Sequence, residues 1–433
     1  MNILDIIGKK RDGKVLTKEE IDFFVKEYTK GSIADYQAAA LVMAIYINGM
    51  NEMETTDLAL AMANSGDILD LSELGTVMDK HSTGGVGDKV TLIIMPIVAS
   101  LGVKVAKMSG RGLGITGGTK DKLEAIPGYR TDISIEEFIE NVKRINISLI
   151  GQTMNLAPAD KKLYALRDAI NCTASIPLIS SSIMSKKIAA GSSKLVIDVT
   201  CGSGAFMKNI EEAKKLSESM INIGKIAGKE TVCIITNMNQ PLGRMVGNTL
   251  EIIETVKALR GEIESDVREV VLELGAYILL LDGKGKNIEE NKKAIEEAIN
   301  TGIAYKKFLE LIQSQGGDIS YIENLEKFEK AKFKMEVIAE KSGYVQKIDA
   351  EEVGKIASYL GAGRIKKEDN INYEVGVELN KKVGDFVNKG EMLGYIYADD
   401  EEKGKKSVNI LKNIYIITEE KTQKPKEIIE ILK

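Results

Sequence analysis

The sequence contains no tryptophan, a single histidine and only three cysteines in 433 residues. The cysteines are Cys172, Cys201 and Cys233, and their scattered positions match neither the spacing of a metal site nor an even set of disulfides. We therefore expect them to be buried thiols.

The chain also lacks a hydrophobic run long enough to cross a membrane. Its longest nearly uncharged helical run, residues 36–50, is too short and too rich in alanine to span a bilayer, and the N-terminus has no secretory hydrophobic segment. These absences predict a cytoplasmic protein without a membrane partner.

An excess of positive charge is missing as well. Lysine and arginine number 59 against 64 acidic residues, which gives a formal net charge of -5, whereas a nucleic-acid binder is usually basic. With 44% hydrophobic and 28% charged residues, the composition is ordinary for a globular protein, and the length allows two or three domains. We expect chemistry on small molecules and no nucleic-acid partner.

Glycine is plentiful, and residues 76–129 contain two glycine-rich loops. The pattern there predicts strand, loop, helix, strand, loop and helix, with a helix at 90–101 and a strand at 101–105, which is a parallel βαβα unit. Each loop would present backbone N–H groups at the start of a helix, where oxyanions bind. The loop residues are Ser82, Thr83, Gly84, Gly85 and Gly87 in the first loop, and Ser109, Gly110, Gly112, Gly114, Thr116, Gly117, Gly118 and Thr119 in the second.

His81, the only histidine, lies at the mouth of the first loop. A lone histidine can simply pack or cap the end of a strand. A proton donor beside an oxyanion pocket is nevertheless a plausible chemical pairing, and we favour that interpretation.

Several helices are predicted at the N-terminus. Thr17 and Glu20 have the spacing of a capping box at the start of a helix over residues 16–28, and helical periodicity continues through 33–50 and 52–65. The first sixty-odd residues therefore resemble a small helical bundle.

Ser182 and Lys186 are four residues apart in a predicted helical segment, so both side chains lie on one face. They can converge on one ligand, or they can belong to a solvated basic helix that carries a serine by chance. Spacing alone favours neither interpretation.

The second half of the chain continues as alternating strands and helices and then changes in texture. A charged helix is expected over 321–334, and from Val337 onward short alternating strands are separated by glycine turns. The segment 383–393 is similar to the hairpins of lipoyl and biotinyl carrier domains, but no modifiable lysine beside methionine is present, which favours a structural role.

Together these patterns predict an α/β fold with three parts. The first sixty-odd residues form a small all-helical region, and a larger α/β region with a mostly parallel central sheet follows it. Residues 334–433 form a strand-rich, sandwich-like α+β domain.

Long ordered motifs across nearly the whole chain resemble the pyrimidine-nucleoside phosphorylase and thymidine phosphorylase family. They include KHSTGGVGDK, SGRGLG followed by TGGT, APADKKLYALRD, SIPLI followed by SSIMSKK, GSGAFM, MNQPLG and GAGR. The resemblance implies a homodimeric pentosyltransferase of pyrimidine salvage that uses no organic cofactor. It would cleave uridine, thymidine and deoxyuridine with inorganic phosphate, giving the free base and (2-deoxy)ribose 1-phosphate. The resemblance also implies that a helical lid domain of residues 1–66 and 160–192 closes over an α/β domain of residues 67–159 and 193–333.

The same resemblance implies roles for individual residues. The catalytic residues would be His81, Arg167 and Lys186. Phosphate would be bound by Lys80, Ser82, Thr91, Lys107, Met108, Ser109 and Thr119, and the pyrimidine by Tyr164, Arg167, Ser182 and Lys186. At position 107 this sequence has lysine, as do members of the family that accept both uridine and thymidine.

A monovalent cation such as K⁺ is also implied, with ligands at Gly87, Leu242, Met245 and Glu254. Lys89 stands where those members usually have a smaller residue, so its ammonium group could replace the ion. Another departure is Ile115, which stands in place of a second histidine and leaves open a non-catalytic nucleoside-binding homologue. A further alternative is a phosphoribosyltransferase of the anthranilate type, which would need Mg²⁺ and pyrophosphate and would lack the C-terminal domain.

Overall fold

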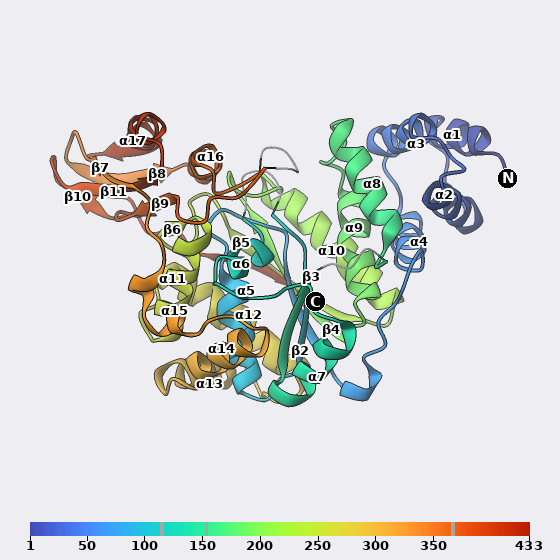
Figure 1. The fold of residues 1–433 in the computed structure, drawn as a ribbon. Helices are drawn as coiled ribbons and strands as arrows, with labels where there is room; N and C mark the ends of the chain where they lie inside the picture. The colour runs from blue at the N-terminus through green and yellow to red at the C-terminus, as the bar shows by residue number, and fades with distance from the viewer. Residues whose placement is uncertain (113–116, 152–154, 365–368) are drawn as a thin grey trace.

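A six-stranded sheet forms the centre of the molecule (Figure 1). The computed structural model describes residues 1–112, 117–151, 155–364 and 369–433. The strand order is β13-β5-β4-β1-β2-β3, and all neighbours are parallel except β13, which runs antiparallel to β5. The strands are β1 (Met78–Ser82), β2 (Val105–Ser109), β3 (Ile147–Gly151), β4 (Lys194–Cys201), β5 (Glu230–Asn237) and β13 (Ile428–Leu432).

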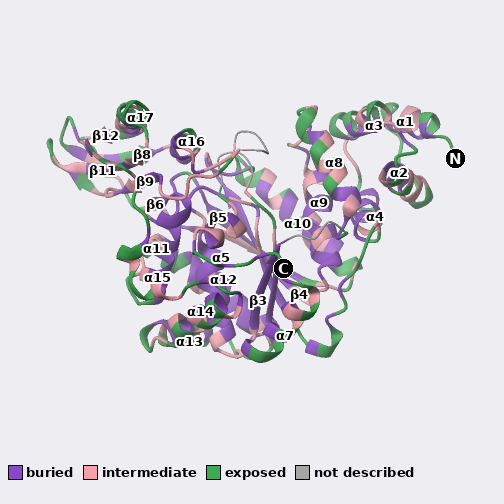
Figure 2. Ribbon diagram, viewed as in Figure 1, coloured by how far each residue is buried: buried purple, intermediate pink, exposed green. Residues whose placement is uncertain are grey.

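Helices cover both faces of this sheet, as the sequence predicts. Successive side chains of a strand point to opposite faces, so Val196 of β4 joins one apolar cluster while Leu195 and Ile197 join another. Figure 2 shows the strands buried between these layers. One face carries α5 (Val90–Ser100), α11 (Asn248–Leu259), α12 (Ser265–Asp282), α13 (Ile288–Asn300) and α14 (Ile303–Ser314), and the other carries α7 (Ile135–Ile145) and α10 (Ile210–Ile226).

A group of helices packs beside the sheet around a separate apolar cluster that joins the N-terminal helices to residues 159–178. The predicted capping box is confirmed, because Thr17 Oγ1 accepts from Glu20 N at 3.3 Å and Thr17 N donates to Glu20 Oε2 at 2.7 Å. The helices are α1 (Ile3–Arg11), α2 (Lys18–Lys30), α3 (Asp35–Asn48), α4 (Glu52–Ala63), α8 (Pro158–Ala169) and α9 (Ile176–Ala189).

The C-terminal part contains a three-stranded and a four-stranded antiparallel sheet around an apolar cluster of their own. Residues 383–393 do not form a carrier-type hairpin, because β10 pairs with β8 whereas β11 pairs with β7 and β9. The elements are β6 (Met245–Val246), β7 (Phe333–Ile338), β8 (Gly343–Ile348), α16 (Ala350–Leu360), β9 (Gly376–Leu379), β10 (Phe386–Val387), β11 (Met392–Ala398), α17 (Glu401–Ile414) and β12 (Tyr415–Thr418).

Other elements differ from expectation for local reasons. The helix predicted over 321–334 is reduced to α15 (Ser320–Glu323) and the 3₁₀ turn η2 (Leu325–Lys327), because Asn324 is extended and its side chain accepts from Glu326 N. The strand expected at 101–105 is wrong in position, since a turn with Gly102 at φ 90° delays β2. Two short elements complete the chain, η1 (Ser72–Leu74) and α6 (Thr119–Glu124).

The end of the chain returns to the central sheet. Residues 428–432 were predicted within the C-terminal strand-rich domain, but β13 pairs with β5 of the α/β part. Among the described residues, no helix combines the length and the apolar character needed to cross a membrane.

A buried ion pair in the helical group provides a test of this packing. Lys10 Nζ lies 2.7 Å from Glu54 Oε1, and both side chains are almost completely buried. We expect Glu54→Ala to lower the free energy of unfolding by about 3–5 kcal/mol, because it leaves an unpaired buried ammonium group. Urea denaturation measures this loss.

The matched control is Glu296→Ala, which removes the partner of Arg268 in an exposed pair 2.9 Å long. Its cost should stay below about 1 kcal/mol, because solvent screens exposed pairs. Equal losses in the two variants would show that the Lys10–Glu54 pair does not stabilise the helical group.

Candidate functional site

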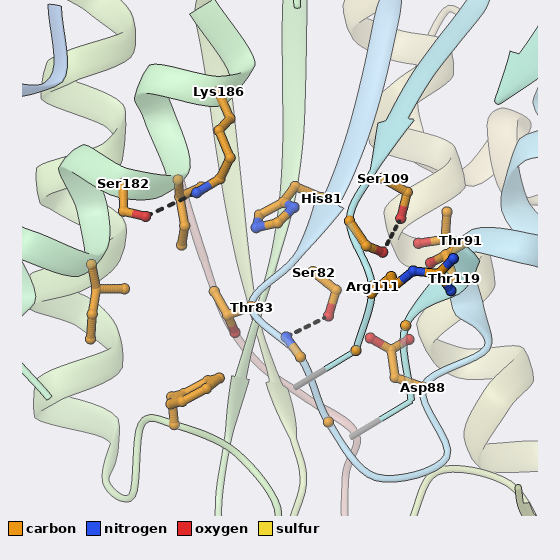
Figure 3. Close-up of a pocket in the computed structure, with 18 of the residues that line it drawn as sticks. His81, Ser82, Thr83, Asp88, Thr91, Ser109, Arg111, Thr119, Ser182 and Lys186 are labelled. Carbon is orange, nitrogen blue, oxygen red and sulfur yellow. Dashed lines mark hydrogen bonds between the residues drawn. The ribbon is translucent and has the colours of Figure 1, made fainter. Parts of the chain in front are cut away.

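A cavity of about 340 Å³ lies where β1 and β2 end, between the glycine-rich loops and helices α8 and α9 (Figure 3). Ligands of parallel sheets usually bind at the carboxyl ends of the strands. The cavity is large enough for a small organic molecule and an anion together. Its polar lining residues include His81, Ser82, Thr83, Asp88, Thr91, Lys107, Ser109, Arg111, Thr119, Tyr164, Arg167, Thr173, Ser182, Lys186 and Lys187.

The first glycine-rich loop connects β1 to α5 and needs its glycines for steric reasons. Gly84 has φ 100° and donates from its backbone N to Ser82 Oγ at 3.1 Å. A methyl group at Gly85 would lie 2.3 Å from Met238 Cε. The loop therefore packs tightly against its surroundings and leads directly into α5, whose first turn presents Thr91 to the cavity.

Below the loop, the carboxylate of Asp79 is buried between two ammonium groups. Lys107 Nζ lies 3.1 Å from Asp79 Oδ1, and Lys187 Nζ lies 2.7 Å from Asp79 Oδ2. Burial would raise the pKa of Asp79, but the two lysines outweigh it and lower that pKa. Burial lowers the pKa of Lys107 to about 7, although Asp79 opposes the shift.

His81 ends up at the centre of the cavity wall, between Lys186 and Ser182 of α9 on one side and Ser82 and Ser109 on the other (Figure 3). Burial of the imidazole lowers the pKa of His81 well below its ordinary value. Four nearby ammonium groups lower it further, those of Lys187, Lys107, Lys186 and Lys80. The imidazole is thus neutral near pH 7, and it can donate one N–H hydrogen bond.

The helical side of the cavity presents Ser182 and Lys186 from adjacent turns of α9. Lys186 Nζ donates to Ser182 Oγ at 2.9 Å and to Asp160 Oδ2 at 2.7 Å. This contact confirms that the two side chains share one face of the helix. Tyr164 of α8 lines the same cavity.

Arg167 lines the cavity too, but its guanidinium group is already committed to backbone carbonyls. It donates to Cys172 O at 3.2 Å, Thr173 O at 2.8 Å and Leu178 O at 2.9 Å. In this conformation Arg167 shapes the turn between α8 and α9.

All but one of the residues predicted to bind phosphate line this cavity. The exception is Lys80, whose buried ammonium group lies 3.2 Å from Asp198 Oδ2 of the neighbouring strand. Met108 lines the cavity from β2 and Thr119 from the first residue of α6. Ile115 lies outside the described residues.

Several lining residues were not singled out from the sequence. They are mostly apolar, and they give the cavity a face suited to a flat ring. Phe206, which is half exposed, stands within the GSGAFM motif, so an exposed aromatic residue in a glycine-rich turn was the available signal. The others include Ile179, Ile183, Leu216 and Thr173.

Two acidic residues of α6, which follows the second loop, bear on the phosphoribosyltransferase alternative, because that enzyme needs free carboxylates for Mg²⁺. Asp121 Oδ1 lies 2.9 Å from Arg111 and 2.9 Å from Arg364, and Glu124 Oε2 lies 2.6 Å from Arg111. The described part of the chain contains no group of three or more His, Cys, Asp or Glu side chains that could hold a metal ion. These carboxylates are neutralised by arginine.

The predicted ligands of a monovalent cation do come together, next to the first loop. A methyl group at Gly87 would lie 2.6 Å from Leu242 O and 3.4 Å from Met245 O. Lys89 Nζ lies among these groups, 2.6 Å from Glu254 Oε2 and 2.8 Å from Leu242 O.

Comparison with known proteins agrees with this architecture. Three family models match, described as the helical bundle domain of a glycosyl transferase family over residues 4–66, the a/b domain of that family over 74–305, and a pyrimidine nucleoside phosphorylase C-terminal domain over 344–418. The structure of anthranilate phosphoribosyltransferase from Thermus thermophilus aligns with a TM-score of 0.59 at 18% identity, covering 72% of this chain and 99% of that one. That likeness concerns the fold alone.

Closer relatives cover almost the full length. The chain is 50% identical over 417 residues to the pyrimidine-nucleoside phosphorylase of Geobacillus stearothermophilus, which covers 96% of both chains. It is 51% identical to the enzymes of the same name from Staphylococcus haemolyticus, over 402 residues, and Staphylococcus aureus, over 403 residues, with 93% of each chain covered. With this identity over nearly its whole length, and with all three family models in order, the chain belongs to the pyrimidine-nucleoside phosphorylase family.

Proposed function

We propose that this protein is a pyrimidine-nucleoside phosphorylase, which uses inorganic phosphate as co-substrate and releases a pyrimidine base and a pentose 1-phosphate. One observation carries the proposal: a single cavity joins a glycine-rich anion loop to the Ser182 and Lys186 face of α9, with His81 between them. Cleaving an N-glycosidic bond leaves negative charge on the base and positive character on the sugar. Such a reaction needs an aligned anion on one side and hydrogen-bond donors on the other.

Phosphate would bind at the two loops. Hydroxyl groups and backbone N–H groups supply donors, and the charge of Lys107 favours an anion. The direct ligands are Ser82, Thr91, Ser109 and Thr119, with Lys107 and Met108 beside them. The ammonium group of Lys80 is paired with Asp198, so Lys80 would act on the phosphate through its charge and not as a direct ligand.

The pyrimidine would lie against α8 and α9. Ser182 and Lys186 hydrogen-bond its polar edge, Tyr164 borders it, and Phe206 with Ile183 supply apolar contact to the ring. Lys186 is held by Asp160, so its ammonium group is pre-positioned for a carbonyl oxygen that gains charge as the base departs. Arg167 supports this side by holding the turn before α9.

His81 would stabilise the departing base as a neutral hydrogen-bond donor. Because its pKa is well below the ordinary value, a charged imidazolium is scarce near pH 7. The N–H group of the neutral ring can still donate to a carbonyl oxygen of the pyrimidine as negative charge develops there. Uridine, thymidine and deoxyuridine are the proposed substrates, because lysine at position 107 resembles family members that accept both uridine and thymidine.

Closure of the cavity would complete the site. We assign residues 1–66 and 160–192 to one helical body, 67–159 and 193–333 to the α/β body, and the remainder before β13 to the C-terminal body. The cavity is lined from both of the first two bodies, so a hinge motion between them would bring base and phosphate into reacting distance.

The wider setting follows from the same assignment. The reaction needs no organic cofactor, and the protein would act in the cytoplasm in pyrimidine salvage. K⁺, the cation implied by the resemblance, does not fit the site formed by Gly87, Leu242, Met245 and Glu254, because the ammonium group of Lys89 is already there.

A homodimer is proposed on the basis of α3. Four of its large apolar side chains are exposed, with Tyr36 at 77% and Ile47 at 72% exposure, and Met43 and Tyr46 near 40% (39% and 42%). Neighbouring exposed apolar residues of this size commonly mark a protein interface.

The proposed reaction is tested by incubating the purified protein with uridine, thymidine or deoxyuridine. Phosphate should cause release of uracil or thymine together with a pentose 1-phosphate, and omission of phosphate should abolish the release. The products are measured by liquid chromatography. Release of the base that requires pyrophosphate and Mg²⁺ in place of phosphate would favour the phosphoribosyltransferase. Nucleoside binding without cleavage would favour the non-catalytic homologue.

His81→Ala should lower the turnover number about 10²- to 10³-fold, because one donor to the developing charge is lost. His81→Gln keeps an N–H donor and should lose less. Steady-state kinetics with phosphate and nucleoside varied separately measures both variants, and the phosphate KM should change little. The pKa of His81 lies well below its ordinary value of 6.5. The pH profiles of the wild-type and His81→Gln rates should therefore have the same shape near pH 6.5. Near wild-type turnover in both variants would contradict the assigned role.

The proposed dimer is tested by light scattering after gel filtration. The wild-type chain should run at twice its 47.3 kDa mass. Ile47→Asp, which places a charge on the apolar face of α3, should shift it toward the monomer, whereas Ile226→Asp at the exposed end of α10 should not. A monomeric wild type would rule the dimer out.

A further inference from the structure

The four residues implied as ligands of a monovalent cation lie close together between the first glycine-rich loop and residues 242–254. A methyl group at Gly87 would lie 2.6 Å from Leu242 O and 3.4 Å from Met245 O, so the loop backbone is in close contact with both carbonyl groups. Glu254 of α11 completes the set. Its Oε1 accepts from Arg244 N at 2.8 Å and its Oε2 accepts from Met245 N at 3.0 Å.

The side chain of Lys89 enters this group of oxygen atoms and is completely buried. Its Nζ lies 2.6 Å from Glu254 Oε2 and donates to Leu242 O at 2.8 Å. A methyl group added at Gly243 would lie 2.8 Å from the same Nζ. An ammonium group and K⁺ are similar in size and carry the same charge, so an ion has no room at this point while Lys89 is present.

The ammonium group of Lys89 is paired with the buried carboxylate of Glu254, so its charge is compensated in this position. The contact places one positive charge where a bound cation would supply it.

We propose that the ammonium group of Lys89 is a built-in replacement for the monovalent cation, so that this protein needs no K⁺ for its stability or for phosphate binding. The stability part of the inference rests on the fold, and only the phosphate part rests on the proposed function.

The position of Lys89 in the chain explains how it would influence phosphate. It immediately precedes α5, and Thr91, two residues later, lines the cavity. Leu242 N donates to Val86 O at 3.0 Å, so the anion loop already lies against the segment that Lys89 holds. Lys89 thus acts as a positioning residue for the loop and for the first turn of α5.

A second buried lysine offers a matched control. Lys382 of the C-terminal part donates to Gly243 O at 2.7 Å, donates to Pro241 O, and lies 2.9 Å from Asp266 Oδ2. It binds the same segment from another side, but among the described residues it shares neither the carboxylate of Glu254 nor the carbonyl group of Leu242 with Lys89. Lys382→Met removes the ammonium group and fills the space with an apolar side chain, so it should weaken the segment without opening a site for K⁺.

The experiment compares KCl with choline chloride at equal ionic strength, using the full-length protein. Wild-type melting temperature and phosphate KM should be the same in both salts. Lys89→Ser should melt several degrees lower in choline chloride, and its phosphate KM should rise about 10- to 100-fold, as is typical when a group that orients a ligand shell is removed. KCl should restore both values toward wild type, because Glu254 and the carbonyl groups can then bind K⁺.

The controls decide between a cation role and a simple structural ion pair. Lys382→Met should lose stability in both salts without recovery in KCl, and Lys89→Ser combined with Glu254→Gln should also fail to recover. A wild type that is stabilised by KCl over choline chloride would overturn the inference, and that measurement needs no variant to fold. A folded Lys89→Ser that KCl does not stabilise would overturn it too. The melting temperature is measured without turnover. If the proposed reaction fails, the response of the melting temperature to K⁺ still tests the inference about Lys89.

Discussion

The contact on which the site most depends is the buried carboxylate of Asp79 between Lys107 and Lys187. Asp79 belongs to β1, Lys107 to β2 and Lys187 to α9, so one side chain connects two strands of the sheet to the helical body. Breaking such a buried pair from one side leaves an uncompensated charge, which is strongly destabilising. The arrangement therefore keeps α9 and the strand ends in register beneath the cavity.

The same lysines determine the chemistry above them. With Lys186 and Lys80 they surround His81, and together with its enclosure they keep its imidazole neutral near pH 7. A neutral donor suits a departing base that only needs stabilising, and the positive surroundings suit a phosphate anion. Charges buried for structural reasons thus also prepare the site for an anionic co-substrate.

Ammonium groups recur where the chain must hold carbonyl oxygens together. Lys89 and Lys382 both bind the segment around residues 241–243, from the anion loop and from the C-terminal part respectively. Each lysine donates in several directions while buried beside a carboxylate, so its charge is compensated. The α/β part and the C-terminal part meet at this segment, next to the loop that would bind phosphate.

The residue order was enough to predict the βαβα unit, the capping box at Thr17 and the placement of Ser182 and Lys186 on one helix face, because each depends on local periodicity or on contacts within one helix. Its motifs also indicated the family and most of the residues that line the cavity. Three features needed the folded chain: the buried pairing of Lys80 with Asp198, the donation of Arg167 to three carbonyl groups and the return of β13 to the central sheet. These depend on which distant carboxylates, carbonyl groups and strand edges come within hydrogen-bond distance, and neither periodicity nor a motif specifies that. The neutral state of His81 has the same origin, because the lysines that cause it come from β1, β2 and α9, and only folding brings them together.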